Sequence, residues 1–171
     1  MLFSDIETAL VAVTNTRSRL AKVDALAAVL RSLAPDEIVP AVGLLTASPR
    51  QGRLGVGWRT LSSRGGSHAD EPSLTIGDID DAFSRLTEIG GAGSAAVRTA
   101  LLDALAERAT AGEWQLLIRV MTGELRTGAL EGVLLDAVAR ASDRDGTAVR
   151  RAAMLSGDLG ETARVALTET V

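Results

Sequence analysis

Apolar residues recur at helical spacing along most of the chain, and convincing alternation of the kind found in β-strands is absent. After Ser18 they fall three or four positions apart and predict one buried stripe, made of Leu20, Val23, Leu26, Leu30 and Leu33. Ser18 is placed to cap this helix, and Pro35 marks its far end. Ser4 and Glu7 have the spacing of a capping box and predict the start of the first helix.

The same spacing predicts further helices over roughly 36–46, 78–89, 95–109, 113–122, 129–141, 146–155 and 160–168. A four-residue strand at 53–56 stays open as an alternative for that segment. Residues 62–77 form the main break in the pattern, because two adjacent glycines and Pro72 interrupt it, and we expect a flexible loop there. His68 is the one histidine, and we expect it to be a loop residue without a chemical role.

The two sides of this loop resemble each other. The matches keep one order: Asp5, Ile6 and Ala9 with Asp78, Ile79 and Ala82; Ser18, Lys22 and Leu26 with Ser94, Arg98 and Leu102; Gly52, Leu54 and Gly57 with Gly123, Leu125 and Gly128. The offset falls from 76 to 71 residues, which corresponds to an insert at 47–51 in the first half. Chance matching is the alternative for any single pair. We predict an all-α helical bundle built from two pseudo-symmetric helical repeats, 1–61 and 78–141, in a single domain. The remaining residues, 142–171, are expected to form C-terminal helices that lead to a catalytic domain absent from this chain.

Charge is segregated along the chain, although the net charge of −4 by itself argues mildly against nucleic acid as a partner. Two stretches carry basic residues and no acid: Arg17, Arg19 and Lys22 in the first, and Arg50, Arg53, Arg59 and Arg64 in the second. The acids gather elsewhere, as at 70–71 and 78–81. This segregation is typical of a protein with one binding face. With two phenylalanines, two tryptophans and no tyrosine, the chain has little aromatic surface for stacking on single strands, which favours the backbone of a duplex.

Composition also limits the cellular setting. The absence of cysteine excludes disulfides and thiolate metal sites. The sequence contains no run of 18 or more apolar residues, so no membrane-spanning helix is predicted. The first residues lack the pattern of a signal peptide. Heavy use of Ala, Arg, Gly and Val indicates a GC-rich bacterial genome. We therefore expect a cytoplasmic protein, associated with the nucleoid of a bacterial cell, with no membrane partner.

Each half contains a Gly-x-Leu-x-x-Gly loop, at 52–57 and at 123–128. Glycines permit positive φ and the close approach of another backbone, and the unpaired N–H groups of a following helix bind phosphate. Arg53 and Arg126 add positive charge to the two loops. The alternative is that both loops are helix C-caps followed by tight turns. A second matched pair, Ser18 with Lys22 and Ser94 with Arg98, places a capping serine one turn before a cation, which is compatible with phosphate or with ordinary capping.

Three patterns are similar to known catalytic or nucleotide-binding motifs without matching them. The loop at 52–57 lacks the strand–turn–helix setting of a nucleotide-binding glycine loop. Lys22-Val-Asp-Ala25 is similar to the Lys-x-Asp-Gly of nucleotidyltransferases, but alanine replaces the glycine and the segment lies in the middle of a predicted helix. Asp80 and Asp81 have no histidine or lysine partner, and we expect them to form solvated surface rather than a metal or acid–base site.

Three stretches and the tail carry a family resemblance: Thr16-Arg-Ser-Arg-Leu-Ala-Lys22, Gly91-Ala-Gly-Ser94, Met121-Thr-Gly-Glu-Leu-Arg-Thr-Gly-Ala-Leu-Glu-Gly132, and the residues 149–161. In this order they resemble the amino-terminal DNA-binding domain of ATP-dependent DNA ligases of the archaeal and eukaryotic replicative type, as also found in actinobacteria. The resemblance covers essentially the whole chain. It implies a helical bundle that grips nicked double-stranded DNA across the minor groove, in replication, repair or recombination. The partner domains implied are an adenylation domain and an oligonucleotide-binding-fold domain.

The resemblance implies phosphate contacts from the two loops and the two helix starts. These residues are Ser18, Arg19, Lys22, Gly52, Arg53, Gly55, Ser94, Arg98, Gly123, Arg126, Thr127 and Gly128. Glu124 departs from the expected pattern, because an acid stands where a base would help. Without Lys-x-Asp-Gly the chain should be inactive alone and hold no cofactor; ATP and Mg²⁺ belong to the full-length enzyme. Two other readings compete: a helical-repeat scaffold for protein–protein interaction, and, less well supported, a helical DNA glycosylase, against which the scarcity of aromatics counts.

Overall fold

A computed structural model describes residues 1–124 and 128–169 of the chain. Over these residues the chain forms ten α-helices, a short 3₁₀ helix and no β-strand, so the all-α prediction is confirmed and the alternative strand at 53–56 is wrong. The elements are α1 (Phe3–Asn15), α2 (Arg19–Ser32), η1 (Pro35–Glu37), α3 (Ile38–Leu45), α4 (Trp58–Ser62), α5 (Ile76–Glu88), α6 (Ser94–Arg108), α7 (Ala111–Thr122), α8 (Gly128–Ser142), α9 (Gly146–Ser156) and α10 (Leu159–Thr168).

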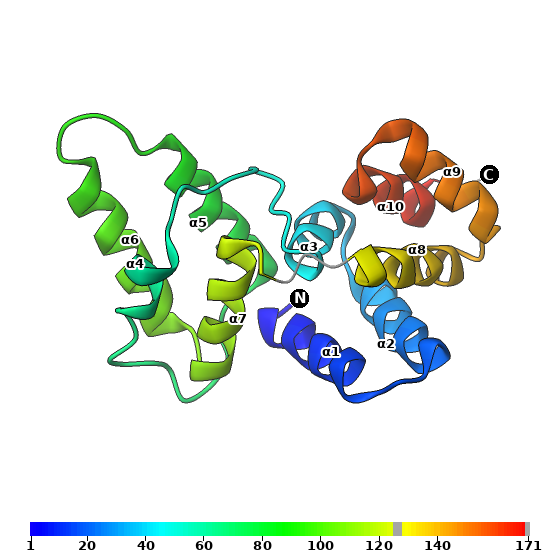
Figure 1. Cartoon of the computed structure of the whole chain (residues 1–171), viewed down its shortest axis with the longest axis horizontal. Helices are drawn as coiled ribbons and strands as arrows, with labels where there is room; N and C mark the ends of the chain where they lie inside the picture. The colour runs from blue at the N-terminus through cyan, green and yellow to red at the C-terminus, as the bar shows by residue number, and fades with distance from the viewer. Residues whose placement is uncertain (125–127, 170–171) are drawn as a thin grey trace.

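The helices gather in two groups (Figure 1). One contains α4 to α7, and the other contains α1 to α3 together with α8 to α10. Within the second group α2 packs along α8, and α3 packs against α10. The groups are joined by contacts of α1 with α7 and of α3 with α5, and the apolar side chains form one continuous core across them. The chain therefore crosses between the groups twice, after α3 and after α7.

The helix starts follow the predicted caps only in part. The Ser18 hydroxyl accepts a hydrogen bond from the Ala21 N–H at 3.2 Å, as expected. The capping box predicted at Ser4 is wrong, because α1 already begins at Phe3. The Phe3 N–H donates to the Leu74 carbonyl at 2.8 Å, so an isolated antiparallel bridge between distant segments, and no side chain, sets this helix start.

Two capping boxes that the sequence reading missed begin α5 and α7. The Thr75 hydroxyl accepts from the Asp78 N–H, and the Asp78 carboxylate accepts from the Thr75 N–H, both at 3.0 Å. Thr110 and Glu113 repeat this arrangement at the start of α7. Each box satisfies two N–H groups that a helix start leaves unpaired. The bond from the Thr75 backbone, followed by the Arg108 guanidinium, lowers the pKa of Asp78 below its ordinary value.

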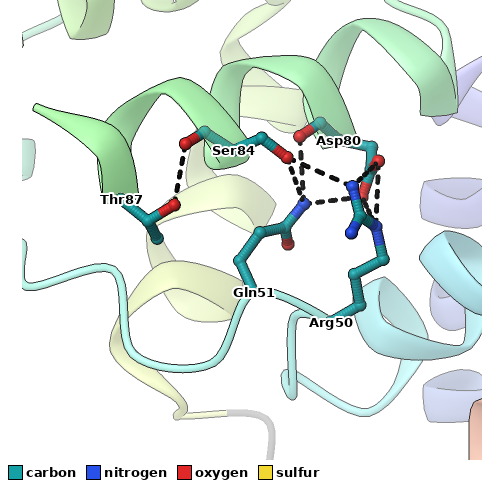
Figure 2. A network of polar contacts seen from close by, with 5 residues as sticks. All are labelled: Arg50, Gln51, Asp80, Ser84 and Thr87. Atoms are coloured by element: carbon teal, nitrogen blue, oxygen red, sulfur yellow. Dashed lines mark hydrogen bonds and ion pairs between the residues drawn. The ribbon is translucent and has the colours of Figure 1, made fainter.

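The segment 47–51, predicted as an insert, connects the two helix groups. Arg50 forms a two-pronged ion pair with Asp80 of α5, with N···O distances of 2.7 and 2.9 Å. The Gln51 amide donates to the Asp80 carboxylate at 2.7 Å and to the Ser84 hydroxyl at 3.1 Å (Figure 2). The expectation that Asp80 forms solvated surface is therefore wrong, because a segment 30 residues away in sequence docks on it.

Two further sequence predictions concern the repeat and the loop. Under a two-fold relation between the halves, α1 would correspond to α5 and α3 to α7. The α1–α7 contact would then correspond to the α3–α5 contact, and both contacts occur. It would also match α4, which has five residues, with α8, which has fifteen. The pseudo-symmetric relation therefore stays a prediction. In the loop before α5, the His68 Nδ1 lies 3.0 Å from the Ala106 carbonyl, so this histidine ties the loop to α6.

Candidate nucleic-acid interface

The first cluster of predicted site residues lines a groove of about 700 Å³ between parts of α1, α2, α7 and α8. We call it the basic groove, and its cations are Arg17, Arg19, Lys22 and Arg119. Buried apolar side chains, Leu10 and Leu116 among them, form part of its lining. The groove brings the start of α2 close to the end of α7, two segments that are about a hundred residues apart in sequence. Arg119 was absent from the predicted site, because helical periodicity shows that it is exposed but not what it faces.

The cations of the basic groove differ in their partners. Arg19 forms an ion pair of 2.6 Å with Asp136 of α8, and Asp136 also binds Arg150. Arg17, Lys22 and Arg119 form no ion pair with any residue that the structure describes. Three positive charges are therefore free to meet an anion at this groove, while Arg19 shares the single negative charge of Asp136 with Arg150.

The second cluster joins the first glycine loop to the start of α6. Gly52 and Gly55 have φ of 79° and 69°, the left-handed conformation that the glycine pattern predicted. The Arg98 guanidinium lies 3.4 Å from the Leu54 carbonyl and 3.3 Å from the Gly55 carbonyl, and it donates to both. Arg98 thus binds the protein's own loop, and the loop of one half meets the helix start of the other. The extended conformation of Gly57, which is the N-cap of α4, does not require glycine.

The predicted cap at Ser94 is wrong. The N-cap of α6 is Gly93, at φ 77°, and Ser94 is already the first helical residue. A turn with Gly91 also at positive φ precedes the helix, and the Ser94 N–H closes it by donating to the Gly91 carbonyl at 3.3 Å. The hydroxyl of Ser94 makes no bond to the helix start.

The second glycine loop begins as a helix C-cap. Gly123 has φ of 77°, and the Glu124 N–H donates to the Arg119 carbonyl at 3.0 Å, which closes the end of α7. At Gly123 the alternative interpretation is therefore the correct one, whereas Gly52 lies well beyond the end of α3. Arg126 and Thr127 lie outside the described residues, and Gly128 is the first residue of α8. Glu124 lines the basic groove, where its negative charge opposes that of the cations.

The basic stretch at 49–64 divides into two kinds of arginine. Arg50 is bound by Asp80, and Arg64 pairs with Asp103 of α6 at 2.6 Å. Arg53 and Arg59 are exposed and form no ion pair with the described residues. Of the four arginines in this acid-free stretch, two therefore remain free, because tertiary contacts pair the other two with aspartates of α5 and α6.

Glu7 lies on the wall of the basic groove beside the start of α7. Burial, together with the nearby Glu113 carboxylate, raises the pKa of Glu7 above its ordinary value of 4.5. A Cβ at position 112 would overlap the Glu7 carboxylate, so the end of the Glu7 side chain lies directly against Gly112 at the start of α7. The Glu113 Oε1 atom is buried without a hydrogen-bond partner among the described residues. The contact between α1 and α7 therefore contains two carboxylates whose negative charges repel each other.

Glu7→Gln is expected to raise the free energy of unfolding at about pH 7. Folding raises the pKa of Glu7, so the ionised carboxylate destabilises the folded state. This destabilisation is absent at a pH below 4.5, the pKa in the unfolded chain, and it is complete at a pH above the pKa in the folded chain. The advantage of the variant should therefore vanish as the pH falls below about 4.5. Urea denaturation across this pH range measures the difference in unfolding free energy between the variant and the parent. The control is Glu107→Gln, at an exposed position of α6. A variant that is less stable than the parent at neutral pH would contradict the assignment.

Within residues 1–124 and 128–169, no group of three or more His, Cys, Asp or Glu side chains is arranged to hold a metal ion. No helix in that part is long and apolar enough to cross a bilayer. The Lys22–Ala25 segment lies inside α2, as predicted, and its Asp24 pairs with Arg140 of α8 at 2.9 Å. Among the predicted site regions that the structure describes, free positive charge lies in the basic groove and in the exposed part of 53–59.

Comparison with known proteins identifies the family. The family described as "DNA ligase N terminus" matches residues 58–139. A probable DNA ligase of Pseudarthrobacter chlorophenolicus is 59% identical over 170 residues, covering 99% of this chain and 34% of the relative. Probable DNA ligases of Saccharopolyspora erythraea and Rhodococcus jostii are each 49% identical, covering 98% and 95% of this chain. The chain spans about a third of the length of these curated relatives. Its all-α fold, its basic groove and these similarities agree, and the chain belongs to the family of DNA ligase amino-terminal regions.

Proposed function

We propose that this chain binds nicked double-stranded DNA through the sugar–phosphate backbone, as the DNA-binding part of an ATP-dependent DNA ligase. The observation that carries the proposal is the basic groove, where Arg17, Lys22 and Arg119 converge from two helix groups without an acidic partner among the described residues. Duplex DNA presents about one negative charge per 1.7 Å of its axis, and unpaired cations are what such a polymer binds. The likeness to probable DNA ligases supports the same conclusion.

The start of α2 adds directional groups to these charges. The Ser18 hydroxyl satisfies the Ala21 N–H, and the Lys22 N–H bonds to the Ser18 carbonyl. The N–H groups of Arg19 and Leu20 have no partner among the described residues. Together with the positive end of a fourteen-residue helix, they form a site suited to one phosphate oxygen, flanked by Arg17 and Lys22. None of these groups reads a base, so the binding is independent of sequence.

The proposed role of the chain is positioning rather than chemistry. Sealing a nick requires a lysine that becomes adenylated and carboxylates that hold Mg²⁺, and we assign both, with ATP, to the remaining part of the full-length enzyme. By holding the duplex, the chain would raise the effective concentration of the nick at tethered adenylation and oligonucleotide-binding-fold domains. This role fits replication, repair or recombination in the bacterial cytoplasm. A protein–protein scaffold is not favoured, because the similar proteins are probable DNA ligases and unpaired cations line the groove.

The test is a salt titration of duplex binding. The chain is mixed with a fluorescently labelled nicked duplex, and anisotropy gives the dissociation constant between about 50 and 200 mM salt. The three cations of the basic groove predict a contribution of about −2.7 to the slope of log K against log salt, so the measured slope should be at least this steep. The slope and the affinity should be the same on unrelated base sequences. No measurable binding at the lowest salt concentration would overturn the proposal for this chain.

A further inference from the structure

Trp58 differs from the other aromatic residues of the chain in its exposure. The chain has two phenylalanines and two tryptophans, and Phe3, Phe83 and Trp114 are at most 1% exposed. Trp58 is 55% exposed. An indole left in water forgoes the free energy that burying so large an apolar surface would contribute, and exposed Trp is enriched where a partner covers it. Although the sequence contains few aromatic residues, one of them, Trp58, is therefore available for contact with a partner.

The backbone around Trp58 is held firmly. Leu54 and Leu61, on either side of it, are buried at 4% and 0% exposure. Arg98 of α6 donates to the carbonyls of Leu54 and Gly55, and the Leu61 N–H donates to the Gly57 carbonyl at 3.2 Å. Trp58 is the first residue of α4, between these anchors. Its side chain is thus presented from a fixed backbone, which reduces the entropy lost when a ligand binds.

The arginines that lie near Trp58 in the sequence suit a nucleotide. Arg53 and Arg59 are exposed and form no ion pair with the described residues. By contrast Arg64, two residues beyond the end of α4, donates to Asp103 at 2.6 Å and to the Thr99 hydroxyl. An exposed indole with two free guanidinium groups close to it in the chain combines a stacking surface for a base with cations for the adjoining phosphates.

We propose, on the basis of the proposed function, that Trp58 stacks on a nucleobase at an interruption of the duplex, while Arg53 and Arg59 bind the phosphates beside it. In a continuous duplex both faces of each base are covered by neighbouring bases. A gap exposes a base face, and at a nick one strand lacks its covalent link, so opening the stack costs less. The substrate recognised at this surface is therefore a duplex with an interrupted strand, and the contact to the base is independent of its identity.

Tryptophan fluorescence tests the stacking directly, because a stacked base quenches indole emission. Trp114 is buried and supplies a constant background. The 171-residue chain is titrated with equal-length duplexes that are continuous, nicked, or carry a one-nucleotide gap, and the anisotropy of labelled DNA is followed in parallel. We expect strong quenching by the gapped duplex, weaker quenching by the nicked one and little by the continuous one. Binding without quenching on all three, or equal quenching by all three, would overturn this inference and leave the proposed function standing. Absence of any anisotropy change would instead overturn the proposed function.

Substitutions give the matched comparison. Trp58→Ala is expected to weaken binding to the gapped duplex roughly 5- to 30-fold and to leave the continuous duplex nearly unaffected. Trp58→Phe should retain most of the affinity, because a phenyl ring also stacks. Met154→Ala removes an apolar side chain that is 77% exposed on α9, and it should change neither affinity. An equal loss on all duplexes after Trp58→Ala would overturn the inference; if that variant fails to fold by circular dichroism, the titration of the parent chain decides.

Discussion

Replacing Arg17, Lys22 and Arg119 together with alanine is expected to weaken duplex binding by roughly a hundredfold or more at about 0.1 M salt. Each phosphate contact releases about 0.9 of a counterion, so three lost contacts should lower the salt slope by about 2.7. The fold should survive, because none of the three side chains is paired with an acid among the described residues. The loss should be the same on every base sequence, since the groups removed contact only the backbone.

Anisotropy titrations at several salt concentrations measure both quantities on one set of samples. The control is the double variant Arg85→Ala and Arg151→Ala, which removes two exposed arginines outside the basic groove. It should lower the affinity only slightly, through the change in net charge. If the control and the triple variant lose affinity equally, the basic groove is not the place where the duplex binds. Thermal unfolding followed by circular dichroism confirms that all the variants compared are folded.

The second large effect concerns stability. Trp114→Ala is expected to lower the free energy of unfolding by about 3–5 kcal/mol, because it removes the largest fully buried side chain and leaves a cavity. Trp114 lies on α7 close to the loop before α5, where a Cβ on Gly65 would come within 3.3 Å of its Cδ1 atom. The melting temperature should fall by roughly 10 °C for a chain of this size. Urea denaturation followed by circular dichroism measures the change.

Trp114→Phe is the matched comparison for this site. The indole N–H is buried without a hydrogen-bond partner among the described residues, so a phenyl ring removes an unsatisfied donor while it refills part of the space. We expect its loss of stability to be well below half that of the alanine variant. A loss below about 1 kcal/mol for Trp114→Ala would show that the α4–α7 group tolerates the cavity, contrary to its close packing.

Periodicity predicted the position of every described α-helix except α4, because it depends on contacts within four residues along the chain, whereas capping patterns predicted the helix starts only in part. The stripe after Ser18 lies on α2, which has the predicted cap, but burial of Leu20 was predicted wrongly, because this residue in the first turn is 60% exposed. The predicted helices from 78 to 168 correspond to α5 to α10, with ends shifted by a few residues. The predicted caps at Ser4 and Ser94 are wrong. An isolated β-bridge to a distant segment sets the start of α1, and a glycine turn sets the start of α6. The five-residue helix α4 is too short to show a period.

Which charges are free for function was decided by the tertiary structure. Arg50 and Arg53 lie in one acid-free stretch and look alike in the sequence, but α5 places Asp80 against Arg50 only. Arg19 and Lys22 are one turn apart on α2, yet only Arg19 is paired with Asp136, which also binds Arg150. An ion pair depends on where a partner far along the chain is brought by packing, and no local pattern contains that information.

The sequence by itself determined the all-α class, the positions of most helices and, through the order of its motifs, the family. Only the tertiary structure placed the end of α7 beside the start of α2 and so added Arg119 to the groove, and only it left Trp58 exposed while burying the other three aromatics. The physical reason is the same in both cases. Helices form from local hydrogen bonds, whereas a binding surface consists of side chains that the packing of the core has left without a partner.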